Sequence, residues 1–187
     1  MKTNIHKYIN MNPSAPIIKG LIKIHKPEYP IRPVVNWRNA PAYKIAGSFT
    51  HEIKRLVPLP NTHNISNTLD LIYKLKDTPI IPRYGLASLD IANLYTNVLV
   101  KETRDIICDT LERLQLNPQA RHELLGWYDV ITLQNYFSNN GDILIQKEGL
   151  AMSVPTSGLL AEFFLQPLEQ LHISHLSDKY KIIKYFR

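Results

Sequence analysis

The sequence lacks several features that define whole classes of protein. Its 187 residues include one cysteine, Cys108, so no disulfide can form within the chain. It has no apolar run of about 18 residues and no signal-type N-terminus. It also shows no internal repeat or low-complexity segment. These absences argue against a secreted disulfide scaffold, a repeat protein and a membrane span, so we expect an intracellular protein, nuclear or cytoplasmic.

Acidic residues are scarce in the first third of the chain. Residues 1–60 hold ten Lys or Arg and two Asp or Glu, whereas the remainder holds twelve basic and fourteen acidic residues. The net charge of +6 is therefore an N-terminal property. Such an excess is typical of a surface that contacts phosphates, because each contact releases counterions. A solubilising surface has the same composition, so charge alone leaves both interpretations open.

Prolines are concentrated in the same region. Eight of the thirteen lie in residues 1–60, which favours short strands and turns there. Residues 17–24 and 31–35 predict a basic β-hairpin. Apolar spacing then predicts a helix between Pro41 and Pro58. A shorter helix is expected over 67–76, capped by Ser66, with an apolar face of Leu69, Ile72 and Tyr73.

The second half of the chain alternates between strand and helix signals. Pro155 can open a long final helix, and its inward face is expected to comprise Ala161, Phe164, Leu165, Leu168 and Leu171. The complete order predicts an α+β domain, with helices on one face of a mainly antiparallel sheet. The expected elements are a buried strand at 84–91, helices at 102–114 and 118–131, a hairpin at 136–145, the final helix kinked at Pro167, and a strand beginning at Tyr180.

The most informative segment is residues 88–97, Ser-Leu-Asp-Ile-Ala-Asn-Leu-Tyr-Thr-Asn. An aspartate at the end of an apolar strand is held rigidly and projects its carboxylate into a cleft, which suits a Mg²⁺ ligand. Asp90 occupies this position. It could instead cap the turn that follows, as an isolated Asp often does.

This segment resembles the first catalytic motif of reverse transcriptases, and it is most like that of the Penelope-like retroelements, in which Ser-Leu-Asp-x-x-x-Leu-Tyr-Thr-Asn is typical. Residues 19–37 resemble the fingers of the same family. Residues 146–169 resemble the next palm motif, although Ser153 stands where these elements usually have glycine. The similarity covers about residues 19–187, after an N-terminal extension of residues 1–18. Three motifs in the expected order are more specific than any one of them.

The resemblance implies a right-hand polymerase fold, with fingers at about 19–80 and part of the palm at about 81–187. It implies an RNA-directed DNA polymerase that uses Mg²⁺ or Mn²⁺, with two ions in the complete enzyme. The family's third motif, Tyr-x-Asp-Asp, is expected to follow Arg187. We therefore expect the 187-residue chain to be inactive by itself.

The resemblance also assigns roles to individual residues. Asp90 would be the catalytic carboxylate and would ligate both metals, with the backbone carbonyl of Ile91 as a second ligand. The incoming deoxynucleoside triphosphate would contact Lys23, Arg32, Tyr95 and Gln146. The template and primer would contact Lys19, Lys26, Gly149 and Ser153.

The expected partners are an RNA template, a DNA primer and deoxynucleoside triphosphates, without a membrane. Self-association through the incomplete edge of the palm is also expected. Two other interpretations remain open at this stage. The chain could be a non-catalytic nucleic-acid-binding fragment or relic of such an element, or a protein unrelated to polymerases whose charge serves solubility.

Other residue types with chemical potential favour structural roles. His172 and His175 are three residues apart but have no second pair or partnering cysteine, so we expect them on a helix surface. Cys108 has no adjacent base in the sequence and is interpreted as a small core residue.

Overall fold

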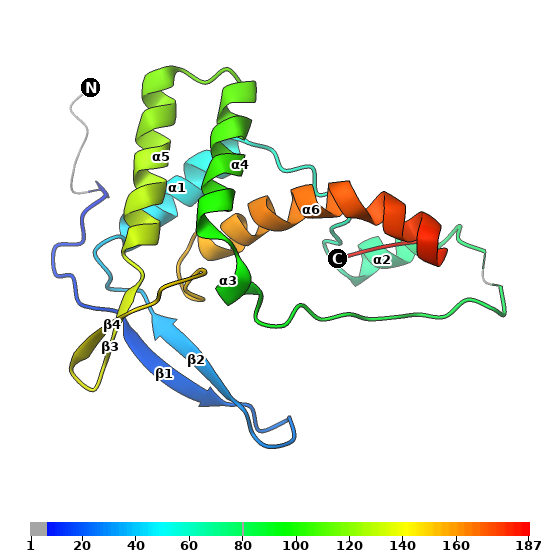
Figure 1. Cartoon of the computed structure of the whole chain (residues 1–187), viewed down its shortest axis with the longest axis horizontal. Coiled ribbons are helices and arrows are strands. Elements are labelled where there is room, and N and C mark those ends of the chain that lie inside the picture. The colour runs from blue at the N-terminus through cyan, green and yellow to red at the C-terminus, as the bar shows by residue number, and fades with distance from the viewer. Residues whose placement is uncertain (1–6, 80) are drawn as a thin grey trace. The chain divides into compact units, whose positions relative to one another are not determined.

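The computed structural model describes residues 7–79 and 81–187, and it combines helices with strands (Figure 1). The α+β class expected from the sequence is confirmed. In chain order the elements are β1 (Ile17–Ile22), β2 (Ile31–Asn36), α1 (Tyr43–Leu56), α2 (Thr68–Leu75), α3 (Leu94–Asn97), α4 (Val100–Arg113), α5 (Pro118–Leu133), β3 (Tyr136–Asn139), β4 (Asp142–Ile145) and α6 (Ser157–Tyr180).

The chain divides into two compact units. The first unit comprises the described parts of residues 1–59 and 93–165, and the second comprises those of 60–92 and 166–187. The first unit therefore contains both hairpins, α1, α3, α4, α5 and the beginning of α6. The second contains α2, the rest of α6 and the irregular segment that precedes α3. Each unit is described separately below.

The sheet of the first unit consists of two hairpins joined at one point. Among the described residues it has four strands in the order β2-β1-β3-β4. Both hairpins are antiparallel, and β1 and β3 run parallel through the single pair Ile17 and Ser138. The Ser138 N–H donates to the Pro16 carbonyl at 2.6 Å. The mainly antiparallel sheet is thus confirmed, and Asn140 and Gly141, both with positive φ, form the predicted turn between β3 and β4.

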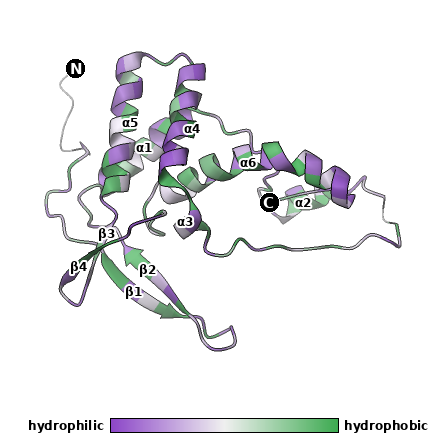
Figure 2. Ribbon diagram, in the orientation of Figure 1, coloured by the Kyte–Doolittle hydropathy of each residue, from purple (hydrophilic) through white to green (hydrophobic). Residues whose placement is uncertain are grey.

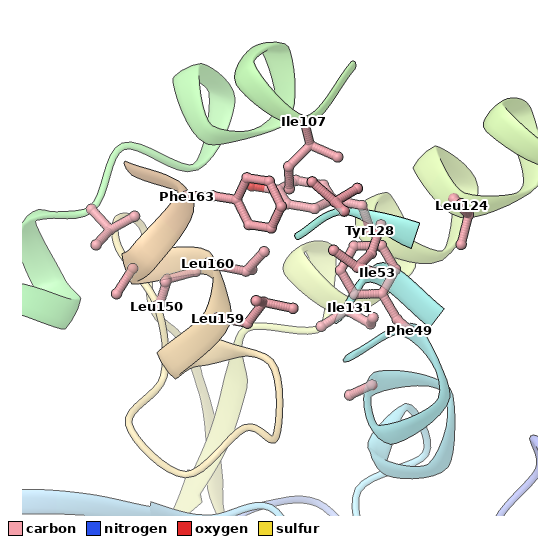
Figure 3. Packing of buried hydrophobic residues seen from close by; sticks show 14 of the residues in the cluster. Phe49, Ile53, Ile107, Leu124, Tyr128, Ile131, Leu150, Leu159, Leu160 and Phe163 are labelled. Atoms are coloured by element: carbon pink, nitrogen blue, oxygen red, sulfur yellow. The ribbon is translucent and has the colours of Figure 1, made fainter. Parts of the chain in front are cut away.

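The core of the first unit is formed by helices. Each helix contributes residues spaced three or four apart, which places them on one face. Helix α5 contacts both α1 and α4. The start of α6 inserts its apolar side chains among them (Figure 3). The principal buried residues are Phe49, Ile53, Ile107, Leu111, Leu124, Tyr128, Ile131, Leu159, Leu160 and Phe163.

The helices do not cover a face of the sheet, contrary to expectation. Among the strand residues, only Val35 is buried. It belongs to a second, smaller cluster with Trp37, Ala40, Ala42 and Ala151 at the foot of the hairpins. The hairpins therefore extend away from the helical core, and apolar residues of β1 and β4 remain on the surface (Figure 2).

The described start of the chain packs on helices of the first unit. The rings of Tyr8 and Trp127 lie 5.2 Å apart, centroid to centroid. The ammonium group of Lys44 donates to the Ile9 carbonyl at 2.9 Å. These contacts tie Tyr8 to α5 and Ile9 to α1, a role that no local sequence signal indicated.

Two predicted strands in the second unit are not formed. Residues 84–91 are irregular, and Leu86 and Leu89 are 101% and 93% exposed. Within the described residues no segment pairs with this run, and an apolar sequence forms a strand only beside a partner. The predicted strand at 180–187 is also wrong: Tyr180 ends α6, and the residues after it are irregular.

Smaller corrections concern the helices. Asn67 caps α2 in place of Ser66, because its side chain accepts from the Asp70 N–H. The predicted apolar face of α2 is exposed. Helix α6 includes Pro167, as expected, but Leu168 and Leu171 are exposed instead of inward. Although α6 has 24 residues, no helix in the described part of the chain is long and apolar enough to cross a membrane.

We predict that alkaline pH destabilises the first unit through Tyr128. Burial, assisted by the charge of Asp129, raises the pKa of the Tyr128 hydroxyl above its usual value of 10. In the unfolded chain the Tyr128 hydroxyl ionises near pH 10. In the folded chain it is still protonated at that pH. The contribution of Tyr128 to stability is thus fully present below about pH 10 and is lost as the pH rises further.

Urea unfolding at about pH 8 and about pH 10.5 checks this prediction. Tyr128→Phe should lower stability at the lower pH by about 1 kcal/mol, because the hydroxyl donates to the Val100 carbonyl at 2.6 Å. The same variant should reduce the loss between the two pH values. Tyr180→Phe is the control, since Tyr180 is exposed. An undiminished loss in Tyr128→Phe would contradict the prediction.

Candidate functional site

The segment expected to carry the catalytic carboxylate spans the boundary between the two units. Asp90 and Ile91 lie in the exposed, irregular run of the second unit. Tyr95 lies in α3 of the first unit and packs partly buried against the helical core. Asn93 begins α3 in the left-handed conformation, with φ of 52°. The rigid strand end that would hold Asp90 is therefore absent from the described structure.

Helix α3 is short, but side chains reinforce it. The Thr96 hydroxyl and the Asn97 amide both donate to the Asn93 carbonyl, at 2.9 Å and 3.0 Å. The Thr96 backbone N–H donates to the same carbonyl at 3.1 Å. These bonds fix the peptide groups of residues 93–97, which makes α3 a firm surface for the residues that pack on it.

Gly149 packs directly against α3. A Cβ atom at this position would lie 2.5–2.6 Å from the Thr96 backbone, closer than real Cβ contacts allow, and φ of Gly149 is +75°. The next residue, Leu150, donates its N–H to the Tyr95 carbonyl at 2.7 Å. Two segments about fifty residues apart in the sequence thus meet backbone to backbone, and only glycine allows this approach.

The turn that carries Gly149 is held on both sides. The Asn135 amide donates to the Gly149 carbonyl at 3.1 Å. The Gln146 side chain donates to the Glu148 carbonyl at 2.8 Å, and its backbone N–H donates to the Asn135 carbonyl at 2.7 Å. Gln146 therefore stabilises the turn in this structure. Ser153 lies partly buried in the next turn, before α6.

The basic residues expected to bind phosphates lie on the first hairpin. Lys19 pairs with Val34, and Arg32 pairs with Leu21. Because side chains alternate between faces of a strand, Lys19 and Arg32 project from the same face. Lys23 and Lys26 form the tip, where the Lys26 N–H donates to the Lys23 carbonyl at 3.1 Å.

None of these four basic side chains forms an ion pair with a described residue. They are thus available to a polyanion. Among the described residues, no hydrogen bond joins them to Tyr95 or Gln146. The structure therefore brings together Lys19 with Arg32, and Tyr95 with Gly149, but it does not link these two pairs directly.

The described residues do not fit the two-metal site that the resemblance implies. No group of three His, Cys, Asp or Glu side chains able to hold a metal ion occurs among them. Asp90 is the one carboxylate that the motif match places at the site, and two ions need several. His172 and His175 are exposed on α6, as expected.

A polar cluster in the second unit is centred on Glu169, which is 9% exposed. Its carboxylate accepts from Arg187 Nε at 2.7 Å and from the Tyr185 hydroxyl at 2.8 Å. The Arg187 N–H donates to the His63 carbonyl, and the Arg187 carbonyl accepts from the Ile65 N–H, both at 2.8 Å. The cluster joins α6, the last residues and the loop before α2.

The sequence showed Glu169 only as part of a motif, with no sign of these partners. Burial and the adjacent Glu169 raise the pKa of the Tyr185 hydroxyl, so it stays protonated as a donor at neutral pH. Gln166, one turn before Glu169, exchanges two hydrogen bonds with Asn61, at 2.7 Å and 3.0 Å. Gln166 and Glu169 are three residues apart and so lie on one face of α6. Two hydrogen-bonding side chains in this arrangement are the sequence signal for a segment that packs on that face.

We predict that Gly149→Ala destabilises the protein much more than Gly141→Ala. Both glycines have positive φ, but a Cβ at Gly141 meets nothing within 4 Å. Gly141→Ala should cost about 1 kcal/mol for backbone strain. Gly149→Ala should cost at least about 2 kcal/mol more, because α3 must also move. Urea unfolding of the two variants measures the difference, and equal losses would show that the approach of Gly149 to α3 is not tight.

The Glu169 cluster yields a second prediction. Glu169→Gln should lower the free energy of unfolding by about 2 kcal/mol, because the ion pair between Arg187 and Glu169 is lost in a largely buried site. Amide exchange at Ile65 and Arg187 should become faster. The matched control is Arg55→Gln, which breaks the exposed Arg55–Glu52 pair and should change stability by less than about 0.5 kcal/mol. Similar effects of both variants would contradict an anchoring role for Glu169.

The chain was compared with protein-family models, with curated proteins and with solved structures. None of the three comparisons finds a match. The functional conclusion therefore depends on the sequence motifs and on the geometry described above.

Proposed function

We propose that this chain contains the fingers and part of the palm of a reverse transcriptase similar to those of Penelope-like retroelements. Its role would be to bind an RNA template with a DNA primer, and deoxynucleoside triphosphates, within an RNA-directed DNA polymerase. The reaction class implied by the resemblance is transfer of a nucleotide to a primer 3′-hydroxyl.

The observation that carries the proposal is the contact of Gly149 and Leu150 with α3. The two segments involved are those that resemble consecutive palm motifs, and that resemblance lies in their sequences and does not depend on the fold. Chance resemblance of two short segments would give no reason for them to pack together. Their backbone contact at Thr96 and Tyr95 is what a shared site requires.

The hairpin supplies further support. Lys19, Lys23, Lys26 and Arg32 lie together on a hairpin that extends from the helical core, without acidic partners among the described residues. Lysine presents a point charge to phosphate and arginine a planar fork. A projecting basic hairpin fits contact with a nucleic-acid backbone.

A specific observation favours the alternative of a non-catalytic nucleic-acid-binding fragment. Asp90 lies exposed on an irregular run, and the described residues hold no carboxylate cluster. Nucleic-acid binding by the hairpin needs no such cluster. The polymerase and the non-catalytic fragment would therefore bind nucleic acid through the same hairpin. They differ in whether residues outside this chain complete a metal site with Asp90.

We predict that the hairpin dominates duplex affinity. Replacing Lys19, Lys23 and Lys26 by Gln should weaken binding to an RNA–DNA primer-template. It should also reduce the slope of log affinity against log salt by up to about one unit for each phosphate that the variant no longer neutralises. Fluorescence anisotropy over a range of salt concentrations measures both quantities.

The matched control replaces Lys101, Lys181 and Lys184 by Gln, which removes the same charge from α4 and from the residues after α6. This variant should keep the slope nearly unchanged. Equal slopes for the two triple variants would remove the phosphate-binding role from the hairpin and leave only a general effect of net charge.

The polymerase assignment has its own test. The 187-residue chain should not extend a primer with Mg²⁺ or Mn²⁺, since one carboxylate cannot hold two ions. A longer version of the protein that also carries the Tyr-x-Asp-Asp motif should extend the primer, and Asp90→Asn in that version should abolish extension. Duplex binding without extension in the longer protein would favour the non-catalytic alternative.

A further inference from the structure

A small pocket lies beside the Gly149 turn in the first unit. It is lined by Trp37 from the loop after β2, by Gly149 and Leu150, and by Thr156 and Ser157 where α6 begins. The space open to the centre of a water molecule is about 10 Å³. This is close to the smallest cavity that holds one water.

Two residues that line this pocket each carry a buried polar atom with no hydrogen-bond partner among the described residues. The Trp37 indole Nε1 and the Thr156 hydroxyl form no hydrogen bond within the described part of the chain, and both residues are 1% exposed. A buried polar group without a partner costs about 1–3 kcal/mol. Folded proteins satisfy nearly all such groups, so two orphaned atoms at one pocket indicate a bound ligand.

The other polar side chains that line the pocket have partners, among them Asn135, whose amide donates to the Gly149 carbonyl. The Ser157 hydroxyl donates to the Ala151 carbonyl, and the Thr132 hydroxyl donates to the Tyr128 carbonyl. The residues that line the pocket, all within the described chain, include no charged side chain. The ligand must therefore be neutral and very small. It must accept from the indole N–H, which is a donor only, and bond a hydroxyl, which can donate or accept.

We propose that one water molecule resides in this pocket and bridges Trp37 Nε1 to the Thr156 hydroxyl. The water joins the loop after β2 to Thr156, the residue immediately before α6, in the pocket that Gly149 and Leu150 also line. This site is independent of the proposed function, because it rests on burial and hydrogen bonding alone.

Thr156→Val distinguishes a water-filled pocket from two unsatisfied polar groups by whether it lowers or raises the melting temperature. Valine keeps the shape of threonine and removes the hydroxyl. With a bridging water, the variant should lower the melting temperature by roughly 2–4 °C, because the water loses one of its partners. If the hydroxyl were simply unsatisfied, its removal would leave the melting temperature unchanged or raise it, and that result would overturn the proposal.

A second measurement observes the water directly. In the ¹⁵N-labelled protein, the indole proton of Trp37 is identified by its loss in Trp37→Phe, and Trp127 supplies the other tryptophan signal. The Trp37 proton should show a cross-relaxation peak with water of the sign typical of a long-lived bound molecule. Thr156→Ser, which keeps the hydroxyl, should retain this peak, and Thr156→Val should lose it. A folded wild-type protein without the peak would overturn the proposal.

Discussion

The approach of Gly149 to α3 is the constraint on which the candidate site depends. The turn that carries Gly149 ends at Leu150, whose side chain enters the helical core while its N–H binds the Tyr95 carbonyl. Any side chain at Gly149 would displace α3 or the turn. A helix of four residues is marginal without further contacts, and α3 is held both by its bonds to the Asn93 carbonyl and by its contact with the Gly149 turn. The position of Tyr95 thus depends on a residue distant in the sequence.

The two units achieve stability in different ways. The first unit buries a continuous apolar core between α1, α4, α5 and the start of α6, and such burial contributes about 1.5–3 kcal/mol for each large side chain. The second unit leaves much of its apolar surface exposed, including Leu86 and Leu89. Its described contacts include the polar cluster around Glu169 and the Gln166–Asn61 pair. Charged and polar bonds of this kind hold segments at defined positions but add less stability than a core.

Local sequence signals predicted most of the elements in the first unit. Asn117 and Pro118 correctly marked the start of α5, since Asn117 caps the helix and Pro118 occupies its first turn. Asn140 and Gly141 likewise marked the second hairpin. The same reasoning failed at residues 84–91, where an apolar run predicted a buried strand. That inference assumed a neighbouring strand, and strand formation depends on pairing with distant residues as much as on composition.

By itself the sequence determined the five longer helices, the two hairpins, the N-terminal excess of positive charge and the motifs that suggest a polymerase, but not the short helix α3. These features depend on residues within a few positions of one another, or on composition. Tertiary structure alone decided that Gly149 contacts the Thr96 backbone and that Glu169 accepts hydrogen bonds from Tyr185 and Arg187. It also decided that Trp37 and Thr156 line the same pocket. Each of these contacts joins residues far apart in the chain. Their proximity follows from how the whole core packs, which local propensity does not encode.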